Sequence, residues 1–197
     1  NSQGRCESLA RDTFGDGWDQ SSDDPRKPLN TEVTEERVKS ILSTNQSPDI
    51  PFRYSINPYR GCEHGCSYCF ARPTHSFIDL SPGLDFESKL FAKINAAECL
   101  KREISKKRYV CSPISIGAST DPYQPIEKKY EITRSLIRVL SQARHPFNLV
   151  TKNALVERDI DLLTPLAERS MGKVHVSITP PTNRLSPRFQ PGAPAPM

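Results

Sequence analysis

Apolar and polar residues follow one another along the central part of the chain in a way that predicts strands and helices in turn. Three apolar runs that each end in small polar residues predict strands, at Ile114–Thr120, Phe147–Lys152 and Val174–Thr179. Between them, apolar residues recur at helical spacing over Ile132–Ala143 and Arg158–Arg169. Equivalent threonines near the strand ends are 31 and 28 residues apart, close to the ~30 residues of a βα unit. This rhythm predicts parallel strands connected by helices.

The residues before this rhythm predict further elements of the same kind. Strands are expected at Phe52–Ile56 and, with one interruption of the alternation, at Phe86–Ile94; a helix is expected at Ala96–Lys107. A shorter helix is expected from Thr34, which can cap it, to Leu42. The pattern as a whole predicts an α/β fold with about five parallel strands, too few to close an eight-stranded barrel. We therefore expect a partial (β/α) barrel.

The two ends of the chain differ in composition from the centre. Residues 1–50 carry an acidic stretch with few apolar residues, and we expect a largely irregular, partly disordered extension there. Residues 181–197 form a proline-rich tail in which no regular structure is expected. The folded core is expected to cover residues 51–180, a length that suits a single domain.

Charge and cysteine content narrow the class of protein. With Lys+Arg 27 against Asp+Glu 23, the net charge of +4 is too small to indicate a polyanionic partner. No apolar run is long enough for a membrane span, and no secretion signal stands near the start. Six cysteines without an export signal favour a cytoplasmic protein. The thiols of such a protein are expected to bind metal or to do redox chemistry, rather than to form stabilising disulfides.

One short loop carries the clearest chemical signal. Three of the six cysteines fall within eight residues, at Cys62, Cys66 and Cys69. Gly61 and Gly65 give this loop the unusual backbone dihedral angles that wrapping around a metal centre requires. A closed zinc or iron–sulfur site normally has four protein ligands. Three cysteines therefore indicate a centre with one coordination position left for a ligand that is not protein.

Polar residues at the ends of the predicted strands are expected to lie near the cysteine loop. Thr120, Thr151 and Thr179 close three consecutive predicted strands, and the cysteine loop follows the end of an earlier one. In βα barrels, side chains at these ends face the active site. The sequence therefore predicts that the cysteines and the strand-end residues meet at one mouth.

These residues resemble a known family. The spacing Cys-x3-Cys-x2-Cys, with Tyr68 just before the third cysteine, resembles the motif of the radical S-adenosylmethionine superfamily. The stretch from Asn57 to His75 and the strand-end motifs are similar to the spore photoproduct lyase-like, or DNA-repair-photolyase-like, branch. Those motifs are Ala118–Asp121, Leu149–Lys152, Val176–Ile178 and Thr120–Glu127. The resemblance covers roughly residues 31–179.

The resemblance implies two cofactors and a role for each motif. The three cysteines would bind three irons of a [4Fe-4S] cluster, and S-adenosylmethionine would bind the fourth. Reductive cleavage of S-adenosylmethionine would then give a 5′-deoxyadenosyl radical that abstracts hydrogen from a substrate. Tyr68 would lie near the adenine, while Thr120 and Asp121 would approach the ribose or the amino group. Lys152 and Ser177 would pair with the methionine carboxylate.

The sequence departs from this family in two places. Where spore photoproduct lyase itself has a cysteine that returns a hydrogen atom, this chain has Ala118, so repair of the spore photoproduct is not expected. The family's barrel also continues for at least one more βα unit. The substrate and the catalytic residues therefore stay open; DNA is one candidate substrate, and a flavodoxin-type or ferredoxin-type protein is expected as reductant.

Two plainer alternatives stay open beside the enzyme. Structural zinc could be held by the three cysteines and His64, although four ligands inside eight residues leave little chain to form a tetrahedron. The chain could also be a metal-stabilised binding module, or a fragment that binds a cluster without turnover. Lys152 could then be an ordinary surface lysine, and Thr120 and Asp121 could simply cap a helix.

Overall fold

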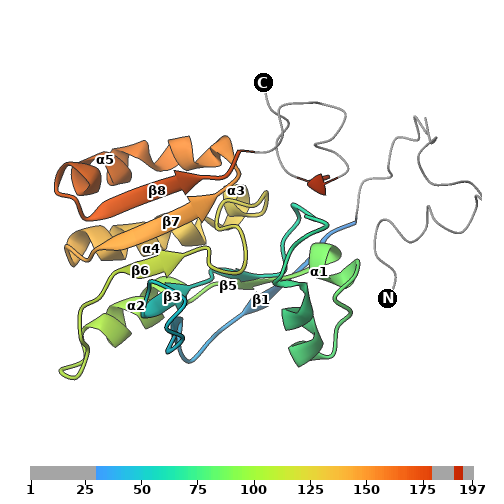
Figure 1. Ribbon diagram of the computed structural model, residues 1–197, viewed down its shortest axis with the longest axis horizontal. Coiled ribbons are helices and arrows are strands. Elements are labelled where there is room, and N and C mark those ends of the chain that lie inside the picture. Colours follow the sequence, from blue (N-terminus) through green and yellow to red (C-terminus); the bar gives the residue numbers. More distant parts are fainter. Residues whose placement is uncertain (1–29, 179–188, 193–197) are drawn as a thin grey trace, which may run out of the picture.

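Two sheets form the framework of the computed structural model, which describes residues 30–178 and 189–192 (Figure 1). The larger sheet has the strand order β2 (Leu42–Thr44), β3 (Tyr54–Ile56), β6 (Ile114–Ile116), β7 (Phe147–Thr151) and β8 (Gly172–Val176). The smaller sheet has the order β1 (Glu32–Glu36), β5 (Lys89–Lys93) and β4 (Tyr59–Arg60). The structure is therefore a mixed α/β fold, as the sequence predicts; closure into a partial barrel stays a prediction.

Strands β3, β6, β7 and β8 are parallel neighbours, and β2 is antiparallel to β3. The α-helices are α1 (Asp85–Ser88), α2 (Ala96–Ile104), α3 (Glu127–Tyr130), α4 (Ile132–Gln142) and α5 (Ile160–Glu168), with short 3-10 helices η1 (Arg72–Ile78) and η2 (Ala154–Asp159). The predicted alternation of strand and helix is thus confirmed between β6 and β8. In the described ranges, no helix combines the length and the apolar character of a membrane span.

One face of the larger sheet forms the core with the helices. On α4, Leu136, Ile137 and Leu140 recur at helical spacing and are fully buried. They belong to the same apolar cluster as Ile116 of β6 and Leu149 of β7. Because successive side chains of a strand point to opposite faces, the residues between these apolar ones face away from the helices.

A polar row crosses the face of the sheet that lies away from the helices. The register places Ser55, Ser115, Asn148 and Lys173 side by side on β3, β6, β7 and β8. The Asn148 Oδ1 atom is buried and has no hydrogen-bond partner among the described residues. Interior layers of βα barrels are usually packed with branched apolar side chains. A polar row indicates that this face accommodates hydrogen-bonding groups instead.

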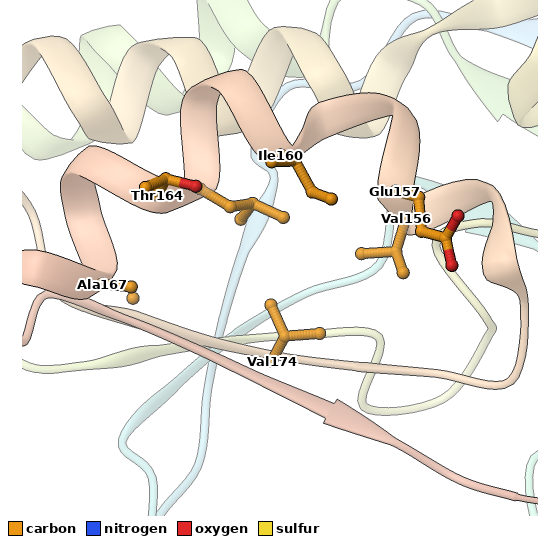
Figure 2. A pocket seen from close by; sticks show the side chains of 8 residues that line it. Val156, Glu157, Ile160, Thr164, Ala167 and Val174 are labelled. Carbon is orange, nitrogen blue, oxygen red and sulfur yellow. The ribbon is translucent and has the colours of Figure 1, made fainter.

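The helix side of the outer strand contains an apolar cavity of about 300 Å³ (Figure 2). Val156 of η2, Ile160 of α5 and Val174 of β8 contribute to its lining. None of the cysteines or strand-end residues predicted from the sequence lines it. The cavity belongs to the packing between α5 and the edge strand β8, not to the predicted site.

Two of the predicted elements near the amino-terminal end differ in the structure. The helix expected at Thr34–Leu42 is absent, because residues 32–36 form β1 and pair in parallel with β5. The strand expected at Phe86–Ile94 begins only at Lys89, since Asp85–Ser88 form α1. The partner strand of β1 is more than 50 residues away, so this pairing is a tertiary effect that a local pattern does not reveal.

Candidate metal and cofactor site

The cysteine loop follows β4 directly and is held tightly at its start. Gly61 has φ +74°, and a Cβ there would come within 2.6 Å of the Leu90 side chain and 2.8 Å of the Phe86 carbonyl oxygen. The next amide, that of Cys62, donates to the same Phe86 oxygen at 2.9 Å. Only glycine combines the left-handed dihedral with this close approach. The sequence thus fixes where the first thiol stands relative to α1 and β5.

The three thiols of the loop are free and lie in partly desolvated positions. Cys62 and Cys66 are buried, and Cys69 is half-buried. Burial raises the pKa of the Cys66 thiol to about 11, the nearby Cys62 sulfur adds to this, and the charge of Lys152 opposes it. Burial likewise raises the pKa of Cys69. Cation binding at these thiols would therefore release protons, as metal binding to cysteine does.

The chemistry of the three thiols suits an iron–sulfur cluster. They are free, lie on one short loop and are soft donors, the ligand type that iron–sulfur clusters use. In such a cluster each cysteine binds a different iron atom, whereas a tetrahedral zinc ion would need Cys62, Cys66, Cys69 and His64 to converge on one point. Within the described residues, no three His, Cys, Asp or Glu side chains are grouped so that they could hold a metal ion. Binding of the [4Fe-4S] cluster therefore stays a prediction.

His64 lies inside the cysteine loop and is almost completely buried, with 1% of its side chain exposed. Its Nδ1 atom is 3.3 Å from Oδ2 of Asp121, an ion-pair distance. Burial by itself would lower the pKa of His64, but the Asp121 carboxylate and the Cys62 sulfur outweigh it and raise the value to about 10. These two neighbours favour the charged form of the ring, although neither ring nitrogen has a hydrogen-bond partner among the described residues. A buried imidazole beside Cys62 that favours its charged form suits a site that collects negative sulfurs.

Asp121 connects the cysteine loop with the end of β7. Its Oδ1 atom accepts hydrogen bonds from the Thr151 hydroxyl at 2.7 Å and the Tyr123 amide at 2.9 Å. Its Oδ2 atom accepts from the Lys152 amide at 2.7 Å and also faces His64. Burial would raise the pKa of Asp121, but these partners hold it below its usual range. The structure gives this carboxylate four protein partners; direct contact with S-adenosylmethionine stays a prediction.

Asn57 ties the end of β6 to the strand that leads into the cysteine loop. Its Oδ1 atom accepts from the amides of Ser119 and Thr120, at 2.8 Å and 3.3 Å. The Thr120 hydroxyl in turn donates to the Tyr59 carbonyl at 3.2 Å, and Thr120 is buried. Lys93 donates from Nζ to the Asn57 carbonyl at 2.7 Å. Thr120 therefore has a place in the framework beside the loop, and its predicted cofactor contact is untested.

Lys93 makes the free energy of unfolding depend on pH in the alkaline range. Burial, with the charge of Arg60, lowers the pKa of Lys93 to about 8 from its ordinary value of 10.5. Between these values the unfolded chain binds more protons than the folded one, so this lysine makes stability rise with pH. We therefore compare the free energies of unfolding of the wild type and of Lys93→Met. The wild-type value minus the variant value should increase by up to about 3 kcal/mol as the pH rises between the two pKa values of Lys93. Urea denaturation at a series of pH values measures the difference; a flat or falling difference would contradict it.

Lys152 and Ser177 lie together at the carboxyl ends of β7 and β8. The Lys152 Nζ atom donates to the Ser177 hydroxyl at 3.3 Å, and its charge lowers the pKa of Cys66. Both residues share the sheet face that carries Asn148, since they lie an even number of positions along their strands from its row. Lys152 therefore lies near enough to Cys66 to influence its thiol, and the predicted pairing of Lys152 and Ser177 with the methionine carboxylate is untested.

A second contact to the loop comes from the carboxyl-terminal region, which the sequence predicts to be irregular. Phe189–Gly192, here called the tail segment, is described and packs on the cysteine loop. Tyr68, which is 58% exposed, accepts a hydrogen bond from the Gln190 side chain through its hydroxyl oxygen. These four residues have defined contacts, although no regular structure is expected in the proline-rich tail. The only local signal is the Pro191-Gly192 turn pair, and it does not say what the turn contacts.

Comparisons with known proteins show relatives of greater length. An uncharacterized protein of Mycobacterium tuberculosis is 34% identical over 174 residues, which cover 87% of this chain and 51% of that protein. An uncharacterized protein of Methanocaldococcus jannaschii is 27% identical over 144 residues, or 73% of this chain and 52% of that protein. No family model matches the sequence. The chain thus spans about half the length of the curated relatives it matches.

The fold itself resembles a known enzyme structure. Spore photoproduct lyase complexed with dinucleoside spore photoproduct aligns with a TM-score of 0.57 at 15% identity, covering 83% of this chain and 44% of that one. A variant of the same lyase with bound AdoMet and dinucleoside spore photoproduct aligns with the same score. At this identity the likeness concerns the fold. The chain therefore has the fold of the matched part of spore photoproduct lyase.

Proposed function

We propose that this chain is the cofactor-binding core of a radical S-adenosylmethionine enzyme. The observation that carries the proposal is the meeting of three free thiols with Lys152 and Ser177 at one edge of a parallel sheet. Support comes from the fold, which resembles that of a lyase whose variant has been seen with bound AdoMet. Neither the thiols nor the strand-end lysine alone would distinguish this function from a structural metal site.

Each group at the site has a task that follows from its chemistry. Cys62, Cys66 and Cys69 would hold a [4Fe-4S] cluster, which when bound supplies the electron that cleaves S-adenosylmethionine to a 5′-deoxyadenosyl radical. Lys152 would pair its ammonium group with the methionine carboxylate, and Ser177 would orient that lysine. Tyr68, exposed beside Cys66, offers a ring on which the adenine could lie.

The substrate would approach the face of the sheet that carries the polar row. Asn148, Lys152 and Lys173 belong to this face, whereas the opposite face is filled by the apolar core. A substrate held there would meet amide, hydroxyl and ammonium groups. Ala118 lies after β6 and offers no thiol to return a hydrogen atom. We therefore propose hydrogen abstraction from a polar substrate and do not assign the identity of that substrate.

Anaerobic reconstitution with iron and sulfide, followed by a cleavage assay, tests the function. The proposal predicts a brown protein with about four irons per chain that forms 5′-deoxyadenosine from S-adenosylmethionine with dithionite. Stoichiometric zinc in the isolated protein, with no coloured product on reconstitution, would contradict the proposal. Cluster assembly without cleavage of S-adenosylmethionine would favour the alternative, in which the chain binds a cluster but does not turn over. The chain spans about half the length of its relatives, so residues needed for turnover could lie in the other half.

Replacing Lys152 with methionine should weaken the binding of S-adenosylmethionine to the reconstituted protein. A hydrogen bond between charged groups contributes about 1.5–3 kcal/mol, so the dissociation constant should rise about 10-fold to 100-fold. Equilibrium dialysis with labelled S-adenosylmethionine measures it. Lys173→Met is the matched control, because Lys173 stands on the same face but two rows from the strand end. Equal dissociation constants in wild type and Lys152→Met would remove this lysine from the site.

A further inference from the structure

The tail segment Phe189–Gly192 contacts the cysteine loop through its backbone. The Ser67 amide donates to the Phe189 carbonyl at 3.0 Å, and the Gly192 amide donates to the His64 carbonyl at 3.0 Å. These two loop positions flank Cys66, the middle cysteine. In Figure 1 the short red segment lies near the teal loop, in agreement with these bonds. The segment therefore satisfies backbone groups of the loop that would otherwise need water.

Two glycines allow this contact to be close. A Cβ atom at Gly192 would stand 1.9 Å from the Glu63 carbonyl oxygen and 2.8 Å from its carbonyl carbon. On the loop side, a Cβ atom at Gly65 would approach Pro191 Cγ to 3.2 Å. Because backbone atoms cannot move aside as a flexible side chain can, any larger residue at Gly192 must displace the segment.

Gln190 adds a side-chain contact to the same loop. Only 3% of this residue is exposed, and its amide donates to the hydroxyl of Tyr68, which stands between Cys66 and Cys69. The tail segment thus contacts the loop at His64, Ser67 and Tyr68. Cys66 lies between His64 and Ser67 in the loop and is itself only 7% exposed.

We propose that Phe189–Gly192 is a clamp that holds the cysteine loop in its ligand conformation and keeps Cys66 away from solvent. The ligand role of Cys66 rests on the proposed function, but the clamping of the loop does not. Gln190 and Gly192 are positioning residues in this scheme, since they act on the thiols through the loop backbone. A chain in which the clamp is displaced keeps its core and exposes the middle thiol.

The test uses the apoprotein under reducing, anaerobic conditions, so it does not depend on whether a cluster binds. Iodoacetamide labelling at pH 8, followed by peptide mass analysis, gives a separate alkylation rate for each cysteine. Gly192→Ala should raise the rate at Cys66 by at least about tenfold, because a released loop opens and exposes the thiol to the reagent. Gln190→Ala should act in the same direction. Gln190→Glu should restore most of the protection, because its carboxylate can accept from the Tyr68 hydroxyl in place of the amide's donation to it.

Two internal controls separate a local release from unfolding. Cys99 is fully buried in the core and reports global opening, so its rate should not change in any of these variants. Phe189→Ala should leave Cys66 protected, because Phe189 bonds to the loop through its carbonyl and its side chain is 44% exposed. Unchanged alkylation of Cys66 in Gly192→Ala, or a parallel rise at Cys99, would overturn the clamp. Failure of cluster assembly in the wild type would instead overturn only the proposed function.

Discussion

Replacing Cys66 with alanine should abolish assembly of a stable iron–sulfur cluster. Cys66 is the middle cysteine of the three, is buried and has its thiol pKa raised to about 11, chiefly by that burial. With two protein thiolates left, two irons of a cubane cluster would lack a protein ligand. We expect iron content after anaerobic reconstitution to fall from about four per chain to near zero, together with the brown absorption.

The matched control for this result is Cys111→Ala. Cys111 is an exposed thiol outside the loop, with its sulfur 3.5 Å from His145 Nε2. Its loss changes the number of thiols without touching the cysteine loop, so iron content should equal that of the wild type. Circular dichroism of both apoproteins should overlay, because neither substitution removes a core side chain of the sheet. Full iron binding by Cys66→Ala would contradict the assignment of the ligands.

The cysteine loop and the main helices could be predicted from the sequence because their signals are local. Three cysteines at short spacing can be recognised in the sequence without knowledge of the fold. The apolar residues of α4 recur at helical spacing, so its buried face can be recognised in the same way. The βα rhythm also predicts that the ends of β6, β7 and β8 lie together. It therefore predicts Lys152 at the same edge of the sheet as the loop, whereas its contact with S-adenosylmethionine stays a prediction.

The partners of the loop could not be predicted, because they come from distant parts of the chain. His64 and Asp121 are 57 positions apart in the sequence, and only the folded chain shows that the histidine faces a carboxylate. The tail segment lies more than 120 residues from Tyr68, inside a stretch whose prolines indicate irregular structure. The pairing of β1 with β5 is a similar case. In each, a tertiary contact decides a conformation that local propensity leaves open.

The buried ionic network beneath the loop carries the second large effect. Glu127 is fully buried and accepts hydrogen bonds from the hydroxyl of Tyr59, the Thr133 amide at 3.0 Å and Arg158 Nη2 at 2.8 Å. Arg158 also donates to Asp159 at 2.9 Å. Tyr59 belongs to β4, three residues before Cys62. The network therefore connects α3, α4 and η2 to the strand from which the cysteine loop starts.

Replacing Glu127 with alanine should lower the free energy of unfolding by about 3–5 kcal/mol, because the groups that bond to this buried carboxylate would be left without their partner. The control is Glu131→Ala: this carboxylate is 53% exposed, 3.9 Å from Arg158, and an exposed pair contributes at most about 1 kcal/mol. Urea denaturation of both apoproteins measures the two changes. Because Tyr59 loses its acceptor, Glu127→Ala should also speed alkylation of Cys62, whereas Glu131→Ala should not. Equal free energies of unfolding for Glu127→Ala and Glu131→Ala would show that the buried network does not anchor the loop.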